Sequence, residues 1–449
     1  MVGIGGIGMS ALAQLLVHQG KNISGSDREE SPTTRLLAEK GISVAIGHDS
    51  CLIPADTELL VYSDAVWPDN QERMRAKEMK IPEMSYFEAL GVVSKDMRTL
   101  AVTGTHGKTT TTGMLAAILK HAGKNPSAIV GSIVSDFGLN RPVGAVGRTD
   151  VPRTSVLGSN YLAGRNDLLV VEACEYKDHM LKLSPEILVI TNAEWDHTDY
   201  FPTLSKMLES FNKAARAVRK EGVVIADPNG ANMQTVLKGV TARIVDYTKE
   251  EVPHLKLLGE FNSENARAAK AAARATWGDP EGQQAVYGAS ISEDVIDEAL
   301  RNFKGSWRRF EYKGETPNGA QVYDDYAHHP TAIEKTLQAV REKFPEKKIV
   351  VAFHAHLYSR TRDLMKGFGE ALAKADEAII APIYPAREKP IPGVTNQTLA
   401  ETISANGGRA RALDSFDEIR DALLKYDSGT LILTMGAGDI YKVAEQITD

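Results

Sequence analysis

Short apolar runs that alternate with helix-like segments are the feature that most constrains how this chain can fold. Each run ends on glycine or on a polar residue, and the segment after it carries the periodicity of an amphipathic helix. Strands joined in this way by helical crossovers form parallel sheets. We therefore predict an α/β fold of mostly parallel sheets with flanking helices. The runs are "KNISGSD", "ELLVYSDAV", "TLAVTG", "LLVVEA", "EILVITNA", "GVVIAD", "KIVVAFH", "EAIIAPI" and "TLILTMG".

The runs group into three blocks, which predict three domains at residues 1–97, 98–306 and 307–449. The first boundary precedes the strand "TLAVTG", and the second lies where "FKGSWRRFEYKG" interrupts the periodicity. Residues 136–166 are rich in Gly, Arg and Ser without periodicity, so we expect a mobile loop there.

Composition excludes several classes of function. The net charge is −7 and no long basic block is present, which makes nucleic acid a poor partner. No apolar run approaches the roughly 20 residues needed to span a bilayer, and no signal segment is recognisable. We expect a cytoplasmic protein without membrane insertion. The two cysteines, Cys51 and Cys174, lack metal-ligand spacing, and we expect both to be reduced.

The stretch "GTHGKT" is the strongest single motif. It follows an apolar strand and opens a helix, which is the layout of a phosphate-binding loop, although it has fewer residues between its glycines than G-x-x-x-x-G-K-[ST]. Lys108 is expected to reach the β- and γ-phosphates of ATP, and Thr109 to offer its hydroxyl to Mg²⁺. A purely structural turn has no need of a lysine here. The motif comprises Gly104, Thr105, His106, Gly107, Lys108 and Thr109, with Thr110 following.

A second glycine motif, "GIGGIG", spans Gly3–Gly8 and precedes a helix predicted at Met9–His18. Its spacing fits a dinucleotide site with Asp27 on a ribose, but any nucleotide diphosphate satisfies it equally, as does a tight structural turn. The strand expected before this turn is only two residues long.

Polar residues at two strand ends are candidate Mg²⁺ ligands, because carboxylate oxygens suit this ion. Glu172 ends one strand, and "TNAEWDHTDY" follows the next, with His197 at its centre. We favour ligation by His197 over a structural role because it lies in a polar cluster. Cys174 is expected to be a packed thiol.

The third block contains the densest chemistry. Two strand ends, "YDDYAHHPTAI" and "FHAHLYSRTRDL", carry histidines that could move a proton near neutral pH. Arg308, Arg309 and Arg360 could bind a carboxylate or a phosphate. Upstream, Asn262 and Asn265 are spaced to share a helix face, where they could bind an adenine edge or cap the helix.

Taken in order, these motifs resemble the Mur ligase family along the whole chain. The resemblance rests on "GIGGIGMSALA", "GTHGKTTTT", "VVEACEYKD", "TNAEWDHTDY", "FNSENARAA", "RRFE", "DDYAHHP", "HLYSRT", "IYPAREKPIPGVT" and "TMGAGDI". It implies a Rossmann-like UDP-sugar domain, a central ATPase domain and a C-terminal dinucleotide-fold-like ligase domain. The chain differs from the common family pattern at Cys174, Tyr176 and Leu357.

The resemblance also implies a role for each matching residue. The pyrophosphate of a UDP-sugar would face Gly5, Gly6 and Gly8, with Ser26, Asp27 and Ser63 on the uridine side. Lys108, Thr109, Glu172 and His197 match the phosphate and magnesium residues; Asn262, Asn265, Arg309 and Asp325 match the other nucleotide contacts; Tyr326, His328, His356 and Arg360 match the region where the amino acid meets the carboxylate.

The implied activity is ATP-dependent ligation of L-alanine to the lactyl carboxylate of UDP-N-acetylmuramate through an acyl phosphate, in peptidoglycan precursor synthesis. Either His328 or His356 could be the general base, and the protein is expected to be a monomer or a homodimer. The nearest alternative is a sibling ligase that adds a recycled peptide or a different amino acid. An NAD-dependent oxidoreductase would leave Lys108 without a role, and a nucleotide-dependent regulatory protein would have lost catalysis.

Overall fold

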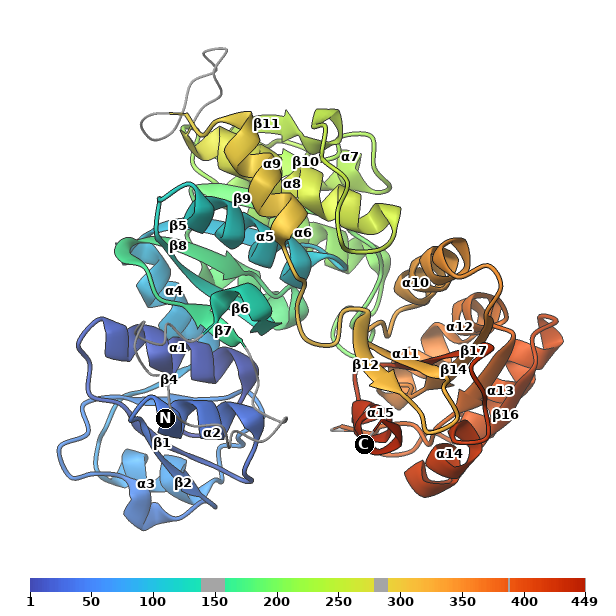
Figure 1. Ribbon diagram of the computed structural model, residues 1–449. Coiled ribbons are helices and arrows are strands. Elements are labelled where there is room, and N and C mark those ends of the chain that lie inside the picture. Colours follow the sequence, from blue (N-terminus) through green and yellow to red (C-terminus); the bar gives the residue numbers. More distant parts are fainter. Residues whose placement is uncertain (139–157, 278–289, 387, 449) are drawn as a thin grey trace, which may run out of the picture. The chain divides into compact units, whose positions relative to one another are not determined.

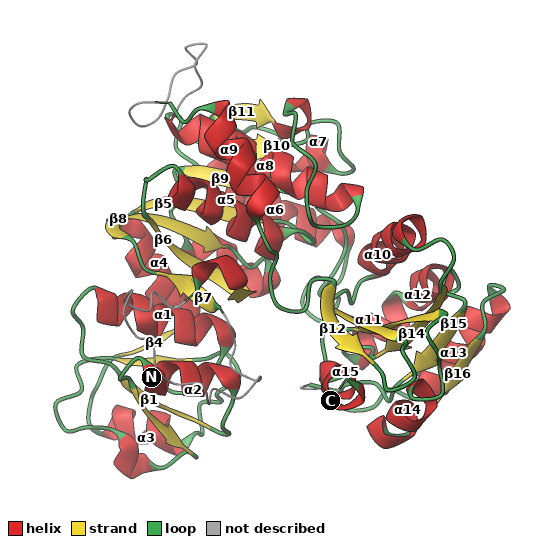
Figure 2. Ribbon diagram, viewed as in Figure 1, coloured by secondary structure: helices red, strands yellow, loops and turns green. Residues whose placement is uncertain are grey.

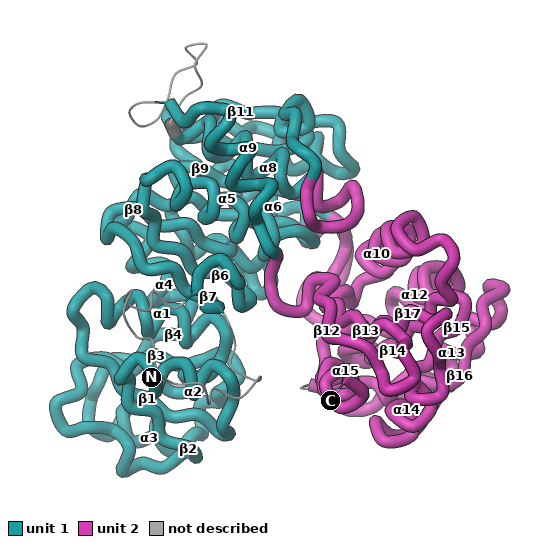
Figure 3. The backbone as a smooth tube through the Cα atoms, viewed as in Figure 1, with its two compact units in different colours: residues 1–193, 208–254, 264–304 teal, residues 194–207, 255–263, 305–449 magenta. Residues whose placement is uncertain are grey.

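The computed structural model describes residues 1–138, 158–277, 290–386 and 388–448. Contacts divide them into two compact units (Figure 3). The first unit comprises residues 1–193, 208–254 and 264–304, and the second comprises residues 194–207, 255–263 and 305–449. Within the described ranges, no helix has the length and apolar character needed to cross a membrane.

The N-terminal part of the first unit has two parallel strand pairs joined by a single residue. Val2 bridges in parallel to both Ser26 and Tyr62, so it stands in for the central strand between β1 and β3. This agrees with the very short strand expected from the sequence. The elements are β1 (Ser24–Asp27), β2 (Ser43–Ile46), β3 (Leu60–Tyr62), β4 (Glu83–Ser85), α1 (Ile7–His18), α2 (Pro32–Glu39), α3 (Gln71–Glu78) and α4 (Tyr86–Asp96).

The first unit also contains a seven-stranded sheet of order β11-β10-β9-β5-β8-β6-β7 (Figures 1 and 2). All neighbours are parallel except β6 and β7. The strands are β5 (Arg98–Thr103), β6 (Pro126–Val134), β7 (Ser159–Leu162), β8 (Arg165–Glu172), β9 (Ile187–Ile190), β10 (Val223–Ala226) and β11 (Arg243–Asp246). The helices are α5 (Lys108–His121), α6 (Leu204–Ala217), α7 (Met233–Val236), α8 (Glu260–Trp277) and α9 (Glu293–Asn302), of which α6 and α8 run across unit boundaries.

The second unit is built on a six-stranded sheet of order β12-β13-β17-β14-β15-β16, parallel except at the β12/β13 edge. Alternate residues of β14 point to opposite faces: Val351 joins the core beneath α10, α12 and α13, and Val350 joins the core beneath α14 and α15. The elements are β12 (Glu311–Glu315), β13 (Gln321–Asp325), β14 (Lys348–Phe353), β15 (Glu377–Ile380), β16 (Ala410–Ala412), β17 (Thr430–Met435), α10 (Pro330–Lys343), α11 (Tyr358–Asp363), α12 (Met365–Leu372), α13 (Asn396–Ala405), α14 (Phe416–Leu423) and α15 (Tyr441–Ile447).

The α/β prediction is confirmed, and each quoted apolar run contains a strand of these sheets. The loop expected over residues 136–166 is wrong in part, because Ser159–Leu162 forms β7 and Arg165 begins β8. Edge strand β7 pairs antiparallel with β6, and its short polar sequence carries little strand signal. Residues 139–157 of that loop lie outside the described residues.

Candidate active site

The predicted phosphate-binding loop connects β5 to α5, and its conformation depends on its glycines. Gly104 and Gly107 have φ angles of 136° and 82°, which side-chain-bearing residues rarely adopt. A Cβ atom on Gly107 would lie 2.2 Å from Oδ1 of Asn265, and one on Gly104 would lie 2.0 Å from Oγ1 of Thr191. The loop therefore approaches its neighbours too closely for any other residue at these two positions.

Lys108 is held inside this loop. Its Nζ donates to the carbonyl oxygens of Gly104 (2.6 Å) and Thr105 (3.2 Å), and it forms an ion pair with Glu175 at 2.9 Å. Burial is the largest single influence and would by itself lower the pKa of Lys108, but the charges of Glu175 and its neighbours Cys174 and Glu172 together outweigh it, and the net pKa is raised. The ammonium group therefore stays charged at neutral pH, at the start of a helix where phosphates bind well.

Glu172 faces the same loop and is fixed from two sides. Thr109 Oγ1 donates to Glu172 Oε1 (3.1 Å), and the Gly131 backbone N–H donates to Oε2 (2.8 Å). A Cβ on Gly131 would lie 2.6 Å from that oxygen, so the glycine leaves room beside the carboxylate. A hydroxyl and a carboxylate next to a phosphate loop are oxygen donors of the kind Mg²⁺ prefers. These residues therefore fit a magnesium ion.

Cys174 lies beside these groups but is not activated. Burial raises the pKa of its thiol to about 12, with Glu175 adding to the effect. A thiol that stays protonated at neutral pH is a poor nucleophile, in agreement with the expected packing role.

The glycines of the N-terminal motif have different surroundings. The Gly5 N–H donates to Asp27 Oδ2 at 2.8 Å, and a Cβ on Gly8 would lie 2.6 Å from the ring of Tyr86. At Gly6 the nearest atom to such a Cβ is 3.4 Å away, so its backbone is the least covered of the three.

Ser26 is fully buried and donates to Glu72 at 2.6 Å. This position does not fit the predicted contact of Ser26 with a substrate, since its hydroxyl is turned into the protein; Ser63 is only partly buried.

In the second unit, the geometry around His328 defines its tautomer. Nδ1 lies 2.9 Å from the carbonyl oxygen of Tyr326, which can only accept a hydrogen bond, so Nδ1 carries the proton and Nε2 keeps its lone pair. Burial, reinforced by the charge of Arg360, lowers the pKa of His328 well below its usual value. The imidazole is therefore neutral at pH 7, with an unprotonated Nε2.

Arg360 lies at the centre of a buried polar cluster. Its Nε donates to Asp196 Oδ1 at 2.8 Å, and both side chains are 3% exposed. Its Nη1 lies 3.4 Å from Nδ1 of His356, whose ring stacks on Tyr384. Burial alone would raise the pKa of Asp196, but Arg360 and the neighbouring histidines hold it well below the usual range. The pair is therefore ionised.

The two neighbouring arginines near β13 have different surroundings. Arg308 pairs with buried Asp324 at 2.7 Å and donates to the carbonyl oxygens of Gly436 and Gly438, so each of its guanidinium nitrogens has a partner within the protein. These contacts stabilise the glycine turn after β17 and differ from the anion-binding role that the sequence suggested. Arg309 lies 5.1 Å from the ring centroid of Tyr326. Burial raises the pKa of Asp325, against the opposing charge of Arg309.

The remaining predicted residues are placed as follows. Asn265, in the first unit, accepts from Thr111 Oγ1 at 3.2 Å and adjoins the phosphate loop. Asn262, in the second unit, donates to the Leu258 carbonyl at 2.7 Å. His197 has a φ of 51°, and its N–H donates to Asp196.

Three residues that contact the site were not singled out from the sequence: Glu175, Gly131 and Glu388. Glu175 and Glu388 lie inside quoted motifs, where a further carboxylate gives no sign of its partner. Gly131 carries no motif signal, because its contact with Glu172 joins residues 41 positions apart on neighbouring strands.

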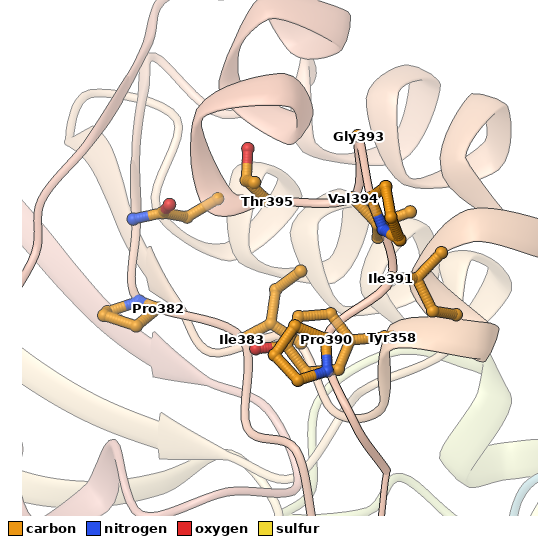
Figure 4. A pocket seen from close by; sticks show the side chains of 10 residues that line it. Tyr358, Pro382, Ile383, Pro390, Ile391, Gly393, Val394 and Thr395 are labelled. Carbon is orange, nitrogen blue, oxygen red and sulfur yellow. The ribbon is translucent and has the colours of Figure 1, made fainter.

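A cavity of about 400 Å³ lies beside α11 in the second unit (Figure 4). Tyr358, Pro382, Ile383 and residues 390–396 line it, and none of these side chains is charged. Thr395 and Asn396 already hydrogen-bond within and beside α13, so the lining is mainly apolar.

A phosphate loop, a carboxylate beside its threonine and a separate sheet carrying buried histidines and arginine define an ATP-using α/β enzyme. Family models match along the chain: "Mur ligase family, catalytic domain" over residues 1–98, "Mur ligase middle domain" over 102–253 and "Mur ligase, glutamate ligase domain" over 308–438. The chain belongs to the Mur ligase family.

Individual relatives agree with this assignment. The chain is 35% identical to the UDP-N-acetylmuramate–L-alanine ligase of Caldicellulosiruptor saccharolyticus over 100% of this chain and 98% of the relative, and 35% identical to that of Clostridium kluyveri over 99% and 96%. Among solved structures, the UDP-N-acetylmuramate–alanine ligase of Thermotoga maritima matches with a TM-score of 0.76 and 27% identity, covering 99% of this chain and 97% of that one. A murein peptide ligase from Psychrobacter arcticus shares the fold, with a TM-score of 0.69, 22% identity and coverage of 100% and 98%.

Proposed function

We propose that this protein joins L-alanine to the lactyl carboxylate of UDP-N-acetylmuramate, with conversion of ATP to ADP and phosphate, in the synthesis of peptidoglycan precursors. The observation that carries the proposal is the phosphate loop with Thr109 against Glu172, in a chain that matches alanine-adding ligases over its full length. We place the reaction in the cytoplasm and expect a monomer or a homodimer. We keep the domain boundaries at residues 97 and 306 as part of the proposal.

The first step makes the carboxylate reactive. A lactyl carboxylate oxygen attacks the γ-phosphorus of ATP, the bond to the bridging oxygen breaks, and ADP leaves. Lys108 neutralises charge that develops on the transferred phosphoryl group, since its ammonium stays protonated at the loop. Thr109 and Glu172, with His197 as a further candidate ligand, would hold Mg²⁺, which would supply positive charge to the phosphates.

The second step forms the amide. The amine of L-alanine attacks the acyl phosphate carbon, the carbon–oxygen bond breaks, and inorganic phosphate leaves. The amine must lose a proton, and His328 Nε2 is our choice of base because its lone pair is available. His356 is less suited, because its Nδ1 lies against an arginine donor. Arg360 would bind the carboxylate of the amino acid.

The remaining residues bind the two nucleotides in this proposal. Asn265 and Asn262 would contact the adenine of ATP, and Arg309 and Asp325 would make the other contacts with this nucleotide. Tyr326 would lie where the amino acid meets the carboxylate. The backbone of Gly5, Gly6 and Gly8 would approach the UDP pyrophosphate, with Asp27 and Ser63 on the uridine side. Gly6 is the most accessible of the three glycines.

The decisive test is phosphate release with ATP, Mg²⁺ and UDP-N-acetylmuramate, with single amino acids added in turn and the products weighed by mass spectrometry. We expect turnover with L-alanine and a product heavier by one alanyl residue. Turnover with a recycled peptide or another amino acid, and not with L-alanine, would assign the chain to a sibling activity. Leu357, which is 1% exposed and is one of the positions where the motifs differ from the common family pattern, makes that comparison informative.

Two lysine variants provide the matched control. Lys108→Ala should abolish product formation, because nothing else in the loop carries positive charge to the phosphates. Lys120 lies on the same helix, is exposed, and within the described residues donates to a single backbone carbonyl, so the turnover of Lys120→Ala should stay near that of wild type. Near-normal turnover of Lys108→Ala would remove the phosphate-loop assignment.

A further inference from the structure

The position of helix α11, which carries Arg360, depends on contacts with other elements. It has six residues, Tyr358–Asp363, too few for a helix to be stable alone in water. Leu357 precedes it with a φ of 72°, a conformation that costs free energy for a side chain of this kind. The direction of Arg360 must therefore be set by contacts from other elements.

The loop between β15 and α13 supplies one set of contacts. Glu388 accepts hydrogen bonds from the backbone N–H of Ser359, at 2.9 Å, and from the Ser359 hydroxyl. A carboxylate at the first turn of a helix is favoured by the helix dipole and satisfies N–H groups that have no partner within the helix. Tyr384 of the same loop accepts from the Leu357 N–H at 2.9 Å, directly before the helix.

Asp196 supplies the second contact, at the guanidinium itself. The Asp196–Arg360 pair is 2.8 Å long and almost completely buried. Apolar residues at two such positions would often stabilise a fold at least as well, because desolvation of two charges offsets their attraction. The pair instead fixes the orientation of the guanidinium group. Nε of Arg360 donates to Asp196, and Nη1 faces His356. Among the described residues, no side-chain or backbone oxygen accepts a hydrogen bond from Nη2.

We propose that Asp196 and Glu388 are positioning residues that hold Arg360 so that its remaining N–H groups point at the carboxylate of the incoming amino acid. The proposal rests on the proposed function, in which Arg360 binds that carboxylate. Asp196 fixes the guanidinium and Glu388 fixes the helix that carries it. Neither residue contacts ATP in this proposal, so their effect is confined to the amine substrate.

The test is a comparison of steady-state kinetics for each substrate in Asp196→Ala, Asp196→Asn and Glu388→Gln. We expect the KM for L-alanine to rise by about tenfold or more in Asp196→Ala and less in Asp196→Asn, which keeps an oxygen acceptor for Nε. The KM values for ATP and UDP-N-acetylmuramate should stay within about twofold of wild type. Glu388→Gln should raise the KM for L-alanine by about threefold to tenfold, since one charged cap is lost.

Arg362→Ala is the matched control, because Arg362 lies on the same helix but is largely exposed, and its ion pair within the described part of the chain is with its neighbour Asp363. It should leave all three KM values near those of wild type. A double variant, Asp196→Ala with Arg360→Ala, should be no worse than Arg360→Ala alone, since Asp196 acts through Arg360. If Asp196 had a purely structural role, its replacement would lower the amount of active enzyme without a specific increase in the KM for L-alanine.

Two results would overturn the proposal: an unchanged KM for L-alanine in both Asp196 variants, or full additivity of the Asp196→Ala and Arg360→Ala effects. If Asp196→Ala does not fold, Asp196→Asn alone decides, with a KM increase of at least about threefold required. Failure of the proposed function is a separate observation, because wild-type enzyme would then show no product that depends on L-alanine, and that result would overturn both.

Discussion

Gly131 matters because the absence of a side chain leaves room for the carboxylate of Glu172. Its N–H holds one oxygen of Glu172, and a Cβ at this position would lie 2.6 Å from that oxygen, closer than real Cβ contacts allow. Backbone strain is not the issue, because Gly131 is not among the residues with positive φ. The glycine therefore shapes the predicted metal site sterically.

Gly131→Ala should raise the Mg²⁺ concentration needed for half-maximal activity by about tenfold, because Glu172 must move to accommodate the methyl group. The measurement is activity titrated with Mg²⁺, together with the Mg²⁺-dependent shift of the unfolding temperature in the presence of ADP. The KM for UDP-N-acetylmuramate serves as the internal control and should not change. An unaltered Mg²⁺ requirement would show that Glu172 is not held by this contact.

His354 makes the stability of the folded protein depend on pH. Its side chain is 5% exposed, Nδ1 has no hydrogen-bond partner within the described residues, and burial lowers the pKa to about 4. Below the unfolded-state pKa of about 6.5, the unfolded chain binds a proton that the native chain does not, so the native state loses stability as the pH falls towards 4.

His354→Gln should remove this dependence, because glutamine does not titrate. The free energy of unfolding of wild type should fall by up to roughly 3 kcal/mol between pH 6.5 and pH 4 relative to the variant, as the size of the pKa shift implies. Urea unfolding at several pH values measures the difference. Parallel pH profiles for the two proteins would contradict the prediction.

At the scale of elements, Arg308 fastens the turn after β17 to strand β13. Its guanidinium is 4% exposed, pairs with Asp324 and donates to two backbone carbonyls of the glycine turn. Thr434 completes the network by donating to Asp324 at 2.6 Å. The turn and the strand therefore share one buried charge pair.

Arg308→Ala should destabilise the protein by about 3–5 kcal/mol, because it leaves Asp324 buried without its counter-charge. Arg420→Ala removes an arginine from an exposed cluster on α14 and should cost less than about 1 kcal/mol. Chemical denaturation of both variants measures the contrast. Equal effects of the two substitutions would argue against the role given to Arg308.

At the scale of the whole molecule, ligand binding should be visible as stability. If the loop at residues 104–110 binds ATP, a non-hydrolysable analogue with Mg²⁺ at 100 times its dissociation constant should add about 2.7 kcal/mol to the free energy of unfolding. Lys108→Ala should lose this gain. Thermal unfolding with and without the analogue provides the measurement, and equal shifts in both proteins would place nucleotide binding elsewhere.

The sequence by itself determined the class of fold and the places where chemistry collects. Strand periodicity is a local property, so each apolar run became a strand, and glycine with lysine and threonine at a strand end already specified a phosphate loop. The sequence could not show which group each carboxylate contacts in the folded protein. Glu175, Asp196 and Glu388 have the same chemistry as any acidic residue until folding brings each against Lys108, Arg360 or Ser359.

Only the tertiary structure decided which polar groups are buried together. Arg308 and Arg309 are adjacent in sequence and both lie over the ring of Tyr326, yet Arg308 is buried against Asp324 and Arg309 is only partly buried. Ser26 is enclosed although it lies next to the carboxyl end of β1, which is the end where open α/β sheets generally bind ligands. The physical reason is that burial and charge pairing depend on contacts between residues far apart in the chain, and these contacts set both the pKa values and the orientation of the reacting groups.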